Sequence, residues 1–150
     1  MSFTGEYRAK LNAKNQVTLP SPLRDALFAL EAHHPLIIFS RQDDGSFLEL
    51  YTAPEWSVIQ QKTEVLARQQ KTPGLNRTLN ARAYPVALEE NGNGRILIPQ
   101  VYAGIFKPAD DIVFIGNTKK IELWNARAYD KQLAENKSSF HSALEDIFEY

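Results

Sequence analysis

The sequence contains no cysteine. This absence excludes disulfide bonds, thiolate metal sites and a cysteine nucleophile, and it is compatible with a reducing cytosol. No stretch reaches the roughly 18 consecutive apolar residues that a membrane-spanning helix needs. The first residues also lack a basic segment followed by an apolar stretch, so we expect neither secretion nor a membrane partner.

Patterns typical of an enzyme are missing as well. Adjacent acids occur at residues 43–44 and 89–90, but neighbouring side chains on a strand point to opposite faces and cannot share a site. Residues 91–94 are too short for a phosphate-binding loop and follow no β-α-β pattern. His33 and His34 have no third ligand at metal spacing. We therefore expect no enzyme, no cofactor, no metal and no small-molecule substrate.

The chain carries little net charge, only −1, which argues weakly against a nucleic-acid partner. The average hides two basic segments. Residues 1–24 carry four basic side chains and one acidic side chain, and residues 60–84 carry five and one, which gives local charges of +3 and +4. Local fields decide where a polyanion docks. Both segments are also compatible with solvated faces, and residues 60–84 with an inter-subunit face.

An internal repeat is the strongest signal that the sequence does contain. Residues 12–20 recur as residues 91–99, at an offset of 79, and each copy is a polar turn, three strand-type residues and a proline. Three later elements recur in the same order: residues 36–39 with 111–114, residues 48–51 with 121–124, and Trp56 with Tyr129. A unit of this size buries a limited core, so we expect the two copies to share one.

Hydrophobic periodicity predicts the elements of the first copy. Strands over residues 6–11 and 17–19 flank a turn in which Asn15 takes a left-handed backbone conformation. Ser21 is predicted to cap a short helix that has Pro22 at its first position.

The same patterns predict the rest of the chain. Further strands are expected at residues 36–40, 47–51, 84–89, 95–98, 111–115 and 120–124. Helices are expected after Thr52, over residues 75–83 and 100–106, after Asn125, and in a terminal segment with Phe140, Leu144, Ile147 and Phe148 on one stripe. We assign residues 1–75 to the first repeat and residues 76–150 to the second. The apolar stripes exceed what one small core hides, so we expect self-association.

Several separate blocks resemble the MraZ family, the two-repeat bacterial members of the SpoVT/AbrB-like DNA-binding superfamily. They are residues 3–7, the two turn–strand–proline motifs and residues 121–124. The resemblance implies an α+β fold with a tandem-duplicated, swapped-hairpin β-barrel core and flanking helices. It also implies a cytoplasmic, nucleoid-associated regulator of the division and cell-wall gene cluster and of its own promoter. The implied partners are double-stranded DNA and further copies of the chain in a ring.

The family's signature is Asp-x-Lys-Gly-Arg in the first repeat and Asp-x-x-Gly-Arg in the second. Lys14, Gly94 and Arg95 match it, whereas Asn12, Asn91, Asn15 and Gln16 stand where the family has Asp, Asp, Gly and Arg. With the local charge, the resemblance gives a candidate DNA-binding set: Arg8, Lys10, Lys14, Asn15, Gln16, Asn93, Gly94 and Arg95.

Gln16 is the departure with the largest physical consequence. Losing a guanidinium removes a phosphate-binding charge and a bidentate guanine reader, and glutamine prefers adenine. Either the sequence preference has shifted, or other cations such as Arg8, Lys10 and Lys14 bear the contact. Lys14–Gln16 also fits a solvated hairpin loop, and Arg95 fits a structural ion pair. The alternative function is an assembly or antitoxin-like interaction module without sequence-specific DNA binding.

Overall fold

The computed structural model describes residues 2–30, 35–41, 46–88 and 94–148. The strands in these ranges are β1 (Glu6–Lys10), β2 (Gln16–Thr18), β3 (Leu36–Phe39), β4 (Phe47–Thr52), β5 (Ala83–Val86), β6 (Arg95–Leu97), β7 (Asp111–Asn117) and β8 (Lys120–Asn125). The helices are α1 (Ser21–Ala29), α2 (Ala53–Gln70), α3 (Leu75–Ala81), α4 (Gln100–Ala103), α5 (Ala126–Glu135), α6 (Lys137–Phe148) and the 3-10 turn η1 (Gly104–Phe106).

The strands form a six-stranded antiparallel sheet in the order β1-β7-β8-β4-β3-β5 and a separate two-stranded sheet of β2 and β6. Only β3–β4 and β7–β8 pair within one half of the chain, and the other pairs join the two halves. The mixed α and β class is confirmed. The expected closed barrel is not, because in the described residues the ladder stays open, with β1 and β5 at its two edges.

The register of the strands reveals an internal two-fold relation. Val17 pairs with Ile96, its own repeat equivalent at the offset of 79. Glu49 likewise pairs with Glu122, its equivalent at the offset of 73. When two antiparallel strands pair equivalent residues directly, a pseudo-two-fold axis passes between them. Such an axis therefore passes between each of these pairs.

The hydrophobic core lies between the large sheet, α1 and the inner side of the β2–β6 pair. Leu23 and Leu27 of α1 are buried in it, on the apolar face that the sequence predicts. The predicted start of this helix is wrong by one residue. Pro20, not Ser21, occupies the N-cap position, and no side chain caps the helix.

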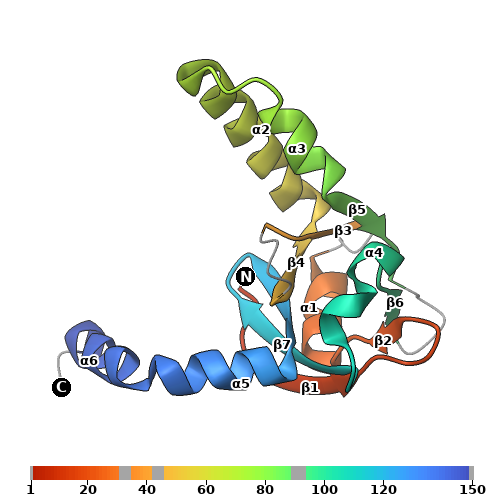
Figure 1. The fold of residues 1–150 in the computed structure, drawn as a ribbon, viewed down its shortest axis with the longest axis vertical. Helices are drawn as coiled ribbons and strands as arrows, with labels where there is room; N and C mark the ends of the chain where they lie inside the picture. Colours follow the sequence, from red (N-terminus) through yellow and green to blue (C-terminus); the bar gives the residue numbers. More distant parts are fainter. Residues whose placement is uncertain (1, 31–34, 42–45, 89–93, 149–150) are drawn as a thin grey trace.

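Two helical arms extend from the body (Figure 1). The α2–α3 hairpin begins at Thr52, whose hydroxyl accepts a hydrogen bond from the Glu55 backbone N–H at 3.4 Å. Trp56, in the first turn of α2, is buried against Phe39 and Tyr51 of the sheet. The α5–α6 arm begins at Asn125, whose side chain accepts from the Ala128 N–H at 3.1 Å. Both caps confirm the sequence prediction. No helix in the described ranges is both long and apolar enough to cross a bilayer.

A charged cluster lies at the pseudo-two-fold axis of the large sheet. Glu49 is only 1% exposed. Its carboxylate accepts hydrogen bonds from Arg41 Nε at 2.8 Å, from the Tyr51 hydroxyl at 2.9 Å and from Lys120 Nζ at 2.5 Å. Burial raises the pKa of Glu49, but the hydrogen bonds from Arg41 and Lys120 outweigh it, and the pKa is lowered overall.

Lys120 also joins the two halves of this cluster. Its Nζ lies 3.3 Å from Glu122 Oε2. Glu122 accepts a hydrogen bond from Trp124 Nε1 at 2.9 Å, as Glu49 does from Tyr51, the repeat equivalent of Trp124. Each glutamate therefore accepts a hydrogen bond from the aromatic residue two positions after it. Lys120 forms an ion pair with both glutamates, and Arg41 forms a second ion pair with Glu49.

Candidate nucleic-acid interface

The turn–strand–proline motif occurs once in each repeat, and its two strands pair to form the β2–β6 ribbon (residues 16–18 and 95–97). Val17 and Ile96 point inward and are 2% and 1% exposed. Because side chains alternate along a strand, the remaining four residues point outward. These outward pairs are Gln16 with Leu97 and Thr18 with Arg95. In Figure 1 the ribbon lies at the margin of the body, apart from both helical arms.

The turn before β2 is organised by Asn12. Its Oδ1 accepts hydrogen bonds from the backbone N–H groups of Lys14 at 2.9 Å and Gln16 at 2.8 Å. Asn15 has a φ of 61°, which confirms the predicted left-handed conformation. Asn12 Nδ2 also donates to Gln16 Oε1 at 3.2 Å. The two residues that replace the family's aspartate and arginine thus contact each other, and the chain has a neutral hydrogen bond where opposite charges would stand.

The corresponding turn before β6 depends on glycine. Gly94, the repeat equivalent of Asn15, has a φ of 74°. A Cβ atom here would lie 2.5 Å from Cδ of Arg24, a residue of α1. The two turns are bonded symmetrically, since Leu19 N donates to Gly94 O at 2.9 Å and Ile98 N donates to Asn15 O at 2.8 Å.

Gly94→Ala is expected to destabilise the protein by about 1–2 kcal/mol from the left-handed backbone alone, with the displacement of Arg24 adding to this. The matched control is Gly104→Ala, because a Cβ at Gly104 meets nothing within 4 Å, and it should leave stability unchanged or raise it by up to about 1 kcal/mol. Urea unfolding of both variants measures the difference. Equal stability of the two variants would contradict this account of the turn.

The predicted site residues divide into two groups. Lys14, Asn15, Gln16, Gly94 and Arg95 belong to the ribbon and its turns. The Lys14 side chain has no hydrogen-bond or ion-pair partner among the described residues. Asn93 lies outside the described residues.

Arg8 and Lys10, by contrast, lie on β1 and form ion pairs with acidic side chains. Arg8 donates to both carboxylate oxygens of Asp130 on α5, at 2.8 and 3.3 Å. This hydrogen bond raises the pKa of Arg8 and lowers that of Asp130. Lys10 Nζ lies 3.7 Å from Asp111 Oδ1. The structure therefore does not bring these two cations onto the ribbon's outer face.

Sequence reasoning missed two contributors to the site, Arg24 and Leu97. Arg24 lies in the basic segment of residues 1–24, but only the tertiary structure packs it against Gly94. Leu97 is 56% exposed on the outer face of the ribbon. The sequence could have predicted this exposure. Leu97 stands between the apolar residues Ile96 and Ile98, and neighbouring side chains on a strand point to opposite faces.

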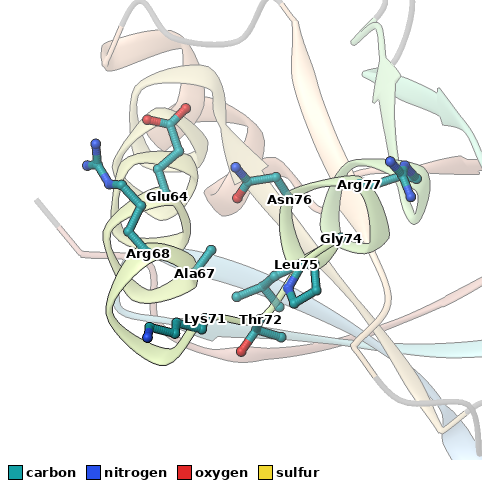
Figure 2. A pocket seen from close by; sticks show the side chains of 10 residues that line it. Glu64, Ala67, Arg68, Lys71, Thr72, Gly74, Leu75, Asn76 and Arg77 are labelled. Atoms are coloured by element: carbon teal, nitrogen blue, oxygen red, sulfur yellow. The ribbon is translucent and has the colours of Figure 1, made fainter.

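Three basic residues of the second basic segment, Arg68, Lys71 and Arg77, line an open cavity of about 830 Å³ at the turn between α2 and α3. Figure 2 shows that its basic side chains are spread out: Arg68 and Arg77 extend to opposite sides, and Lys71 points outward on the side of Arg68, below it. Glu64 adds a negative charge at the rim. These groups do not converge on a common point, which leaves the ribbon as the better candidate for DNA contact.

Comparison with known proteins agrees with the sequence motifs. The model of the MraZ protein family, described as antitoxin-like, matches residues 82–149. The chain is 29% identical over 143 residues to the transcriptional regulator MraZ of Thiobacillus denitrificans, which covers 95% of this chain and 93% of that protein. It is 33% identical over 144 residues to the transcriptional regulator MraZ of Shewanella sp. strain ANA-3, with 93% and 90% covered. For the regulator of the same name from Shewanella amazonensis the values are 31% over 135 residues, with 87% and 84% covered.

These alignments extend over nearly the whole chain and over nearly the whole of each relative. The family model matches the second half of the chain, where Gly94 and Arg95 agree with the family's signature. In the first half, Asn15 and Gln16 differ from that signature. On this sequence evidence, the chain belongs to the MraZ family.

Proposed function

We propose that the chain is a DNA-binding transcriptional regulator and that the β2–β6 ribbon contacts double-stranded DNA. The relatives are named transcriptional regulators rather than enzymes, which supports this reading. The observation that carries the proposal is the ribbon itself, with its inner side anchored in the core and four side chains turned outward. The major groove of B-DNA admits a two-stranded β-ribbon of this kind.

The residues of the ribbon suit different parts of the DNA. Lys14 is a flexible point charge at the turn and suits a phosphate. Arg95 carries a planar guanidinium that can bond two acceptors of one guanine. Gln16 can bond adenine through N6 and N7. Arg8 and Lys10 contribute to the local field while they remain paired with Asp130 and Asp111.

The finer parts of the proposal concern the fold and the assembly. We infer two AbrB-like repeats, residues 1–75 and 76–150, which exchange strands so that β1 joins β7 and β5 joins β3 in a shared core. We infer a ring-shaped homo-oligomer as well. It is supported by exposed apolar side chains on the α5–α6 arm, namely Leu133, Phe140, Ile147 and Phe148. The proposed location is the cytoplasm, on the nucleoid.

The proposed targets are the division and cell-wall gene cluster and the chain's own promoter. A gel-shift assay with the purified full chain tests this directly. DNA from upstream of its own gene should be retarded at protein concentrations that leave a shuffled duplex of the same composition free. Equal retardation of both duplexes would reduce the proposal to non-specific binding.

The second candidate function is an interaction module that keeps the fold but does not read DNA. Two observations favour it: the neutral contact between Asn12 and Gln16 at 3.2 Å and the net charge of −1. Retardation of neither duplex in the same assay would support this candidate against the regulator.

A further inference from the structure

The outer face of the β2–β6 ribbon has one apolar side chain, Leu97, which is exposed to solvent instead of packing in the core. Leu97 is 56% exposed, although it lies between two fully buried neighbours, Ile96 and Ile98. It stands directly opposite Gln16 in the register of the ribbon. Directly opposed side chains on one face have Cβ atoms about 4.5–5.5 Å apart. An amide and an apolar group therefore lie side by side at one end of the proposed DNA-contacting face.

This combination matches the major-groove edge of an A·T pair. Adenine presents N7 and the N6 amino group, which a glutamine can bond, and thymine presents a C5-methyl group, which apolar side chains contact. No other base pair offers a methyl group at this edge. Resting on the proposed DNA-binding function, we propose that Leu97 reads the thymine methyl group while Gln16 reads the adenine paired with that thymine.

The turn before β2 orients the Gln16 amide for bonding to adenine. Asn12 Nδ2 donates to Gln16 Oε1 at 3.2 Å, so the amide is oriented while its two N–H donors stay available. Because the amide oxygen has two lone pairs, it retains one acceptor position for the adenine amino group. Asn12 is a positioning residue in this arrangement.

The opposite end of the ribbon has different chemistry. Thr18 pairs with Arg95 there, two residues or about 7 Å along the strand. That distance corresponds to about two base-pair steps of 3.4 Å each. Arg95 is suited to guanine.

The two ends are related by the internal symmetry of the backbone but not by their side chains. Gln16 is the repeat equivalent of Arg95, and Thr18 is the equivalent of Leu97. The outer face of the ribbon therefore carries different side chains at its two ends, although its backbone is symmetric. It consequently recognises a directional site with A·T at one end and G·C at the other.

The test replaces every thymine by uracil, which removes only the C5-methyl group. Duplexes from upstream of the chain's own gene are made with either base, and binding of the full chain is measured by fluorescence anisotropy. Wild type should bind thymine DNA about fourfold more tightly than uracil DNA for each methyl contacted, the equivalent of about 0.8 kcal/mol for one buried carbon.

Leu97→Ala should bind the two duplexes equally, and because Leu97 is exposed, the variant should melt at the wild-type temperature. Leu66→Ala, an exposed leucine on α2, is the matched control and should keep the preference for thymine DNA. Equal binding of both duplexes by wild type would overturn the methyl reading and leave the DNA-binding function standing. A preference that persists in Leu97→Ala would overturn it too. Failure to bind either duplex would refute the DNA-binding function as well.

Discussion

Residues 76–150, produced without the first half, are expected not to fold as a stable monomer. In the full chain β5 pairs with β3, β6 with β2 and β8 with β4, and β7 has β1 as its second neighbour. The fragment therefore keeps only the β7–β8 hairpin, and an isolated hairpin is marginally stable in water. Circular dichroism and size-exclusion chromatography should show either an unfolded fragment or a dimer that replaces the missing half.

Co-expression with residues 1–75 provides the control for this experiment. The two fragments together should form a folded complex of one copy each, because the cross-half strand pairs can then reform. A cooperatively unfolding monomer of residues 76–150 alone would contradict the interleaved strand order.

Lys120→Met is expected to destabilise the protein by up to about 3 kcal/mol, the lower end of the cost of removing one partner from a buried ion pair, because Glu49 keeps Arg41 as a second partner. Lys120 Nζ lies 2.5 Å from Glu49 and 3.3 Å from Glu122. Without it, two carboxylates face each other at the pseudo-two-fold axis, one of them fully buried. Urea unfolding measures the loss.

Two variants make this measurement specific to the cluster. Lys119→Met changes the exposed neighbouring lysine in the same way and should alter stability by no more than about 0.5 kcal/mol. Adding Glu49→Gln to Lys120→Met removes the repulsion between the Glu49 and Glu122 carboxylates and should restore part of the stability. If Lys120→Met unfolds at the same urea concentration as Lys119→Met, the lysine does not hold the two glutamates together.

Local patterns in the sequence were sufficient for most elements and for several of their details. Apolar alternation predicted the strands, and Asn15, Thr52 and Asn125 adopt the turn and cap roles that their side chains favour. The repeat itself predicted that the halves share one core. The turn and cap roles depend on residues within a few positions of one another, which is why the sequence reveals them. The shared core stays a prediction from the repeat.

Pairing across the halves could not be predicted in the same way. Whether the ladder closes depends on which edges meet, and β1 and β5 remain separate edges of the sheet. Two contacts at the site are equally long-range. Arg8 meets Asp130, 122 positions away, and Arg24 packs on Gly94. Neither contact leaves a periodic signal in the sequence, so the sequence predicts neither the Arg8–Asp130 pair nor the packing of Arg24 on Gly94.

The salt dependence of DNA binding tests the central claim most directly. The affinity of the full chain for DNA from upstream of its own gene should fall as salt rises, because each neutralised phosphate releases counterions. Lys14→Ala should lower the slope of log affinity against log salt concentration by about one unit. Lys62→Ala, on the exposed side of α2, should leave the slope unchanged. An unchanged slope for Lys14→Ala, or a slope lowered only by Lys62→Ala, would contradict the assignment of the β2–β6 ribbon as the DNA-binding surface.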